Sequence, residues 1–150
     1  MDANEVADWM VQEHAKITEL SDQLRQMVAA PPRGDRGVWV RELQSRFEEY
    51  FGRLHRHFEM EEQGGYLTEV LQLRPTLSAA VALVQQEHEE LSELFQDVQS
   101  AVRELAPTDN LVLRDCCERV KQLLAWIERH EEHENHIVLY AFTQDLAAGD

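Results

Sequence analysis

Apolar residues recur every three or four positions through four long stretches of this chain, and prolines and glycines separate the stretches. This period is typical of amphipathic helices. It predicts four helices, over about residues 4–29, 38–63, 75–105 and 111–142. Pro75 suits the first turn of the third helix, and segment 66–73 before it is predicted to be a connection that keeps some helix. Short loops favour antiparallel neighbours, so we expect an all-α, up-down-up-down four-helix bundle.

Length and composition predict one globular domain, residues 1–150. No apolar run approaches the roughly 20 residues that cross a bilayer. The acidic N-terminus has no apolar signal segment, so we expect a cytoplasmic location. The net charge of −15 repels nucleic-acid phosphates and anionic lipids, and we expect neither nucleic acid nor membrane as a partner. Cys116 and Cys117 point about 100° apart on a helix, which predicts two reduced thiols, one of them packed inward.

The two halves of the chain repeat one pattern of histidines. A Gln-Glu-His run that ends at His14 recurs about 74 residues later as a run that ends at His88. His57-x-x-x-Glu61 recurs at nearly the same offset as His130-x-x-x-Glu134. Each half therefore has a lone histidine on one helix and a His-x-x-x-Glu pair on the next. This repeat predicts pseudo-twofold symmetry about the bundle axis.

Helix lengths bring these residues to one level of the bundle. In each half about 16 or 17 residues lead away from the lone histidine and about 19 lead back to the pair, roughly 24 Å and 28 Å in the first half. A single His-x-x-x-Glu pair is more often solvent-exposed, and a lone inward histidine is more often a core residue. A shared level, face and register instead favour a metal site, because coordination offsets the cost of a buried carboxylate. The candidate ligands are His14, His57, Glu61, His88, His130 and Glu134.

Helical position also predicts the surroundings of the site. We expect Trp126 on the inward side, as a pocket wall or core residue, and Tyr50 as a core residue or hydrogen-bond donor. His133 is expected at the edge of the inward face, where it lies on the surface boundary, supports a ligand or is itself an occasional extra ligand. His55, His136 and most of the acidic runs, including Glu131-Glu132, are expected to be solvated. Glu13 and Glu87 are candidates for orienting a ligand histidine.

Four motifs resemble those of the hemerythrin-like, HHE cation-binding family over almost the whole chain. They are Gln12-Glu13-His14, His57-Phe58-Glu59-Met60-Glu61-Glu62, Gln86-Glu87-His88 and His130-Glu131-Glu132-His133-Glu134-Asn135. The resemblance implies a left-handed four-helix bundle that holds two irons joined by an oxo or hydroxo bridge. It also implies bridging roles for Glu61 and Glu134. By the same resemblance His14 and His57 hold one iron, and His88 and His130 hold the other.

The chain departs from the oxygen-carrying members of that family. Those members have a further histidine at the position of Ser92, whose counterpart in the first half is Thr18, and a His-x-x-x-x-Asp in the last helix. The set of four histidines and two glutamates resembles the subgroup associated with nitric oxide or iron–sulfur repair. It would leave each iron an open position facing Thr18 or Ser92.

These features predict a non-haem di-iron protein that binds O2, NO or peroxide, in sensing or in a redox or stress response. A peroxidase or NO-handling enzyme with the same centre is one alternative. An iron sensor or buffer without catalysis is another, so the sequence leaves open whether the protein is an enzyme. Manganese or zinc would also fit the ligands, although zinc prefers four nitrogen or sulfur donors. The electron donor, any protein partner and the oligomeric state stay open.

Overall fold

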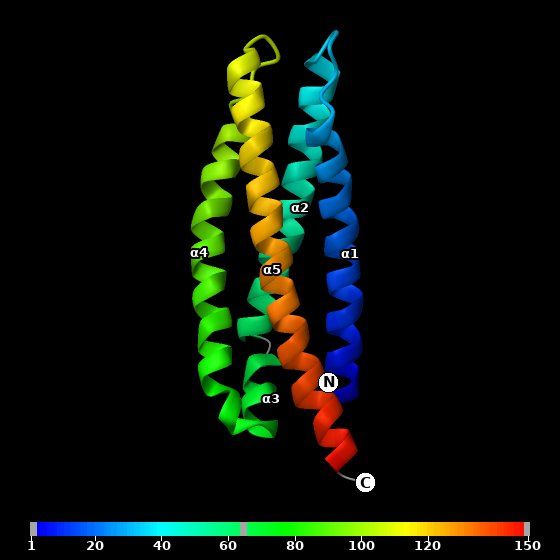
Figure 1. Cartoon of the computed structure of the whole chain (residues 1–150), viewed down its shortest axis with the longest axis vertical. Helices are drawn as coiled ribbons and strands as arrows, with labels where there is room; N and C mark the ends of the chain where they lie inside the picture. Colours follow the sequence, from blue (N-terminus) through cyan, green and yellow to red (C-terminus); the bar gives the residue numbers. More distant parts are fainter. Residues whose placement is uncertain (1–2, 64–65, 149–150) are drawn as a thin grey trace.

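Four long helices form the body of the molecule and run alternately up and down (Figure 1). The computed structural model describes residues 3–63 and 66–148. Its helices are α1 (Ala3–Ala29), α2 (Gly37–Gln63), α3 (Tyr66–Leu73), α4 (Ser78–Arg103) and α5 (Asn110–Ala148), with a 3₁₀ turn at Pro75–Leu77. α1 packs against α2 and α5, and α4 packs against the same two helices. The predicted all-α bundle is confirmed, and the described residues contain no strand.

Aspartates define the starts of two long helices. The Asp35 carboxylate accepts a hydrogen bond of 2.9 Å from the backbone N–H of Gly37, the first residue of α2. The Asp109 carboxylate accepts two hydrogen bonds of 3.1 Å from backbone N–H groups in the first turn of α5. Both side chains satisfy backbone donors that a helix start otherwise leaves unpaired.

The observed boundaries differ from the prediction in three places. Segment 66–73 is a complete short helix, α3, which lies beneath the end of α2 and beside the lower parts of α4 and α5 (Figure 1). Pro75–Leu77 forms a 3₁₀ turn rather than the first turn of α4, which begins at Ser78. α5 continues past Phe142 to Ala148. The predicted stop of the second helix at Gly64-Gly65 lies outside the described residues.

The apolar core has two parts. The main core fills the end where α1 connects to α2 and α4 connects to α5, with Leu24, Phe47 and Leu123 fully buried. The end core, beside α3, includes Met10, Tyr66, Val70, Val84 and Val138. Along α1 the sequence passes from the end core at Met10 through His14 to the main core at Ile17. The predicted ligand level therefore lies between two apolar layers.

Both cysteines are buried and free, with 2% of Cys116 and 4% of Cys117 exposed. The expectation that only one of them packs inward is wrong. The inward stripe of α5 is wide enough at this level to include adjacent positions. No helix in the described residues has an apolar stretch of the length that a bilayer requires.

Candidate metal centre

Six buried side chains meet between the two cores. His14 comes from α1, His57 and Glu61 from α2, His88 from α4, and His130 and Glu134 from α5. None of these residues is more than 4% exposed, and the two glutamates are fully buried. The structure therefore brings together all six of the predicted ligands.

The first pair of histidines comes from the first half of the chain. His14 Nε2 and His57 Nε2 lie 3.0 Å apart. Glu134 Oε2 lies 3.2 Å from His14 Nε2 and 3.7 Å from His57 Nε2. Glu61 Oε1 is in close contact with His57 Nε2. Two imidazole nitrogens and one oxygen from each glutamate thus surround a single point.

The second pair has the same arrangement with the other two carboxylate oxygens. His88 Nε2 lies 2.9 Å from Glu61 Oε2 and 2.7 Å from Glu134 Oε1. His130 Nε2 is in close contact with Glu134 Oε1. Each glutamate therefore presents one oxygen to each histidine pair. This is the donor arrangement that a carboxylate needs in order to bridge two metal ions.

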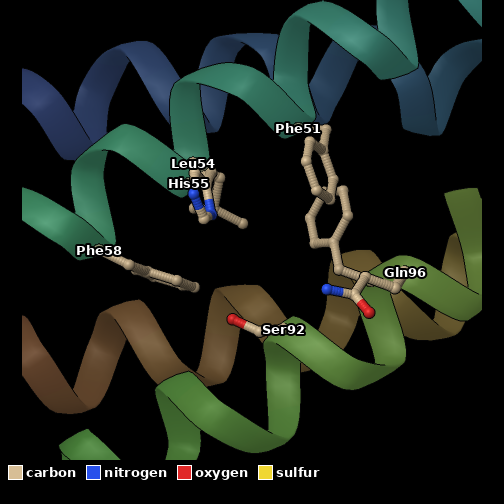
Figure 2. Close-up of a pocket in the computed structure, with 7 residues that line it drawn as sticks. Phe51, Leu54, His55, Phe58, Ser92 and Gln96 are labelled. Atoms are coloured by element: carbon tan, nitrogen blue, oxygen red, sulfur yellow. The ribbon is translucent and has the colours of Figure 1, made fainter.

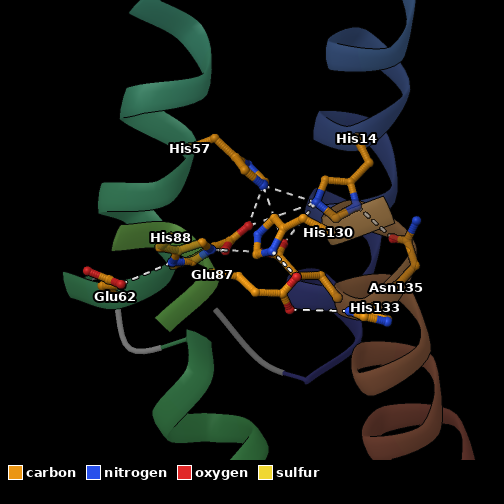
Figure 3. A network of polar contacts seen from close by, with 10 residues as sticks. His14, His57, Glu62, Glu87, His88, His130, His133 and Asn135 are labelled. Carbon is orange, nitrogen blue, oxygen red and sulfur yellow. Dashed lines mark hydrogen bonds and ion pairs between the residues drawn. The ribbon is translucent and has the colours of Figure 1, made fainter. Parts of the chain in front are cut away.

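Two of the histidine rings form a hydrogen bond, through the nitrogen that faces away from the centre, with a residue from the other half of the chain (Figure 3). Asn135 Oδ1 accepts a hydrogen bond of 2.7 Å from His14 Nδ1, and Glu62 Oε1 accepts one of 3.0 Å from His88 Nδ1. Asn135 directly follows Glu134, as Glu62 directly follows Glu61. Each His-x-x-x-Glu motif therefore carries one further residue that orients a histidine of the other half. When a neutral ring carries its proton on Nδ1 and donates it to such a partner, the lone pair on Nε2 faces the centre.

The other two rings have different supports. Glu87 Oε2 lies 3.6 Å from His130 Nδ1, and Glu87 Oε1 lies 3.2 Å from His133 Nδ1. In the first half the counterpart, Glu13, pairs instead with Arg53 at 3.3 Å. Among the described residues His57 Nδ1 has no hydrogen-bond partner. The Trp9 ring stacks on His57, with a centroid separation of 5.7 Å.

The charges of the cluster compensate one another. Burial lowers the pKa of His14, but the adjacent carboxylates of Glu134 and Glu61 outweigh this effect and raise that pKa to about 10. The same balance raises the pKa of His57 to about 9 and that of His88 to about 10. Burial raises the pKa of Glu134, yet the four histidines around its carboxylate hold that pKa well below the usual value. Without metal, protons on the imidazoles therefore neutralise the two carboxylates.

The nitrogen and oxygen atoms of the cluster are better arranged to bind metal ions than to form hydrogen bonds with one another. In the described part of the chain, both Glu61 oxygens, Glu134 Oε2 and both His130 nitrogens are buried without a hydrogen-bond partner. Two groups have ligand atoms that all lie within 4.8 Å of one another: His14, His57, Glu61 and Glu134, and Glu61, His88, His130 and Glu134. The shared members are the two glutamates. A cation in each group would satisfy the buried carboxylate oxygens and His130 Nε2.

The predicted pocket residues have mixed outcomes. Tyr50 is fully buried, in agreement with core filling, and His133 lies on the surface beside Glu87. Trp126 is 51% exposed and packs under Arg129, so its expected inward position is wrong. Thr18 and Ser92 line hollows on opposite sides of the bundle, between α1 and α5 and between α2 and α4.

Sequence reasoning also missed residues around the centre. Glu131 is 6% exposed, which overturns its expected solvated position, and burial raises its pKa to about 7. The Phe58 ring stacks on His88, with centroids 4.3 Å apart, and meets His130 edge-on. Asn135 and Glu62 were identified only as parts of motifs. The available signal was their position, one residue after each inward glutamate.

Comparison with known proteins gives one match. A model of the hemerythrin HHE cation binding domain matches residues 5–142, and the matched region contains all six clustered histidines and glutamates. No curated protein and no solved structure matches the chain.

Proposed function

The chain belongs to the hemerythrin HHE cation-binding family, and from this premise we propose that it is a non-haem di-iron protein that binds O2, NO or peroxide. It is a metal-binding domain with a buried cluster of histidines and glutamates. The observation that carries the proposal is the orientation of Glu61 and Glu134. Each directs one carboxylate oxygen to each pair of histidines. One metal ion would leave half of these donors unsatisfied, whereas two use them all.

The ligand sets define which residues would hold which ion. His14 and His57 would hold one iron, His88 and His130 would hold the other, and the two glutamates would bridge them. We propose an oxo or hydroxo bridge as well, by analogy with the family. Imidazole and carboxylate donors suit iron, and a pair of such ions with open positions can bind a small ligand and exchange electrons with it.

Metal content and absorption spectra test the proposal. Protein produced in iron-rich medium should contain about two irons per chain and show near-ultraviolet absorption from the oxo bridge. Glu134→Gln should hold one iron or none, because a neutral amide is a poor bridging ligand. Glu132→Gln, at an exposed position of the same helix, should retain both irons. One metal or none in the wild-type protein, with its helices intact, would refute the di-iron centre.

The loaded protein then distinguishes the roles. A spectral change on adding O2, NO or peroxide without turnover supports sensing in a redox or stress response. Turnover of peroxide or NO with an electron donor indicates an enzyme, and folding that responds to iron alone indicates an iron sensor or buffer. Manganese or zinc at the same sites would appear in the metal analysis. A cytoplasmic location is part of the proposal, and cell fractionation tests it.

A further inference from the structure

A mainly apolar hollow lies between α2 and α4 (Figure 2). It has a volume of about 70 Å³. Its lining comprises Phe51, Leu54, Phe58 and Phe95, with His55, Ser92 and Gln96 also contributing. A water needs roughly 10–15 Å³ together with two to four polar partners, so this space has the size but few of the partners. Such a space suits a small apolar molecule.

Phe58 joins the hollow to the candidate ligands. Its ring stacks on His88 at 4.3 Å and lies 5.3 Å from the His130 ring, measured between centroids. Phe58 and Ser92 also line a wider outer groove of about 370 Å³, and His88 forms part of the wall of that groove. The groove, the hollow and the His88 side of the centre therefore adjoin one another around Phe58.

Charge at the outer groove selects against anions. Its wall includes the carboxylates of Glu59, Glu62, Glu89 and Glu93, on a chain with a net charge of −15. Repulsion by these groups lowers the local concentration of anionic ligands. A neutral but polar molecule such as peroxide would lose its hydrogen bonds to water on entering a space lined by phenyl rings. An apolar diatomic molecule has no such hydrogen bonds to lose.

The internal repeat supplies a polar counterpart on the other side of the bundle. The hollow between α1 and α5 has a volume of about 30 Å³. Thr18, Ser21 and Glu131 line it at the repeat positions that correspond to Ser92, Phe95 and Phe58. A carboxyl and a hydroxyl therefore replace two phenyl rings. Of the two equivalent hollows, the one between α2 and α4 is the larger and the more apolar.

We propose that the hollow between α2 and α4 is a binding site for a small neutral diatomic gas, O2 or NO, which passes Phe58 to reach the His88 and His130 half of the centre. The delivery step rests on the proposed function, whereas gas binding in the hollow requires no metal. The ligand of the centre is then a diatomic gas rather than peroxide or an anion.

Xenon tests the hollow independently of the metals, because it is apolar, close to a diatomic gas in size and visible in X-ray maps. Crystals of the full chain under xenon pressure should show the atom between Phe51, Leu54 and Phe95. Ser92→Leu adds carbon atoms at the shared wall and should abolish this binding. Ser100→Leu makes the same substitution at an exposed position of α4 outside the hollow, and xenon should remain.

Stopped-flow mixing of iron-loaded protein with NO tests the delivery step. Ser92→Leu should lower the association rate constant about tenfold, and Ser100→Leu should stay within a factor of about two of wild type. No xenon in the wild-type hollow would overturn the gas site, whether or not the variants fold. Xenon present but an unchanged rate in folded Ser92→Leu would overturn the delivery route. Loaded protein that does not react with O2 or NO would contradict the proposed function, while the xenon result would still decide the hollow.

Discussion

At the scale of single residues, the centre depends on side chains that fix the direction of each imidazole. Asn135 and Glu62 each accept a hydrogen bond from a ring Nδ1–H, which directs the opposite nitrogen to the centre. Neither residue is a candidate ligand. Both occupy the same position of the internal repeat, directly after one of the two buried glutamates that are candidate bridging ligands. The repeat therefore preserves the support of the site as well as its ligands.

Asn135→Ala should weaken metal binding with little effect on the fold. The His14 ring would lose its hydrogen bond of 2.7 Å and with it the fixed orientation of Nε2. Loss of such a partner lowers metal affinity about 10- to 100-fold. Competition with a chelator of known affinity measures this change. Gln122→Ala, at an exposed position of α5, should bind metal like wild type. Equal affinities for both variants would show that the hydrogen bond does not support the site.

Glu131→Gln should stabilise the metal-free protein at alkaline pH. Burial raises the pKa of Glu131 from 4.5 to about 7, so the folded state holds its proton more tightly than the unfolded state does. Stability from this group is fully present below about pH 4.5 and is lost as the pH rises through about 7. The amide has no such loss. We expect the variant to gain about 2–3 kcal/mol at pH 8 and little at pH 5.

Urea unfolding of chelator-treated protein at both pH values measures that difference. Glu132→Gln serves as the control, because Glu132 is the exposed neighbour on the same helix. Its effect should stay within about 0.5 kcal/mol at either pH. A gain in Glu131→Gln that is equal at pH 5 and pH 8 would mean that ionisation of Glu131 does not cause it.

At the scale of helices, apolar spacing predicted the four long elements, and the repeated His and Glu register predicted the level of the centre. The errors on α5 share one cause. At 100° per residue, Trp126 lies about 40° to one side of His130 and Glu131 about 100° to the other. The buried stripe is centred near Ile127, about 60° toward Glu131. Trp126 therefore lies outside the stripe and Glu131 inside it. The prediction centred the inward face of this helix on His130 and Glu134 rather than near Ile127, and both errors follow from that displacement.

Contacts between helices explain what else the sequence could not show. Glu13 and Glu87 occupy equivalent positions and were equal candidates for orienting a histidine. Glu13 pairs with Arg53, whereas the repeat counterpart of Arg53 is the exposed Trp126, and Glu87 faces His130 and His133. This outcome depends on which side chain the neighbouring helix presents. The spacing along one helix contains no such information.

Substitutions of two valines on α4 can distinguish the effect of the end core on iron retention from that of the main core. Val84 lies in the end core one turn before His88, and Val98 lies in the main core, and both are at most 2% exposed. Val→Ala at either position should destabilise the protein by about 1–3 kcal/mol through the cavity that it creates. Only Val84→Ala should speed iron loss to a chelator, because only that cavity lies beside the ligands. Equal rates of iron loss in the two variants would contradict this division.

At the scale of the whole molecule, protons on the histidines can take the place of cations beside the buried carboxylates. Three imidazolium groups around two carboxylates leave the centre with a net charge of about +1, instead of −2 without the protons. The apolar layers on both sides would make uncompensated charge costly. Metal ions compete with these protons for the same nitrogen atoms, so loading and protonation are linked.

Loading with iron at pH 7 should therefore release about three protons per chain. The pKa values of His14, His57 and His88 are raised to about 10, 9 and 10, so all three rings carry a proton at pH 7 before metal binds. Anaerobic calorimetric titration with Fe²⁺ in buffers of different ionisation enthalpy measures the number.

The same protonation gives the metal-free protein a pH dependence that the loaded protein should lack. Stability from a group with a raised pKa is fully present below about pH 6.5 and is lost as the pH rises through its folded value. The three histidines should therefore make chelator-treated protein less stable between about pH 8 and 10, because the buried carboxylates lose their partners as the rings deprotonate. The thermal midpoint of the iron-loaded protein should change much less over that range. Proton release near zero, with parallel pH profiles for the two forms, would show that the imidazoles are neutral before metal binds.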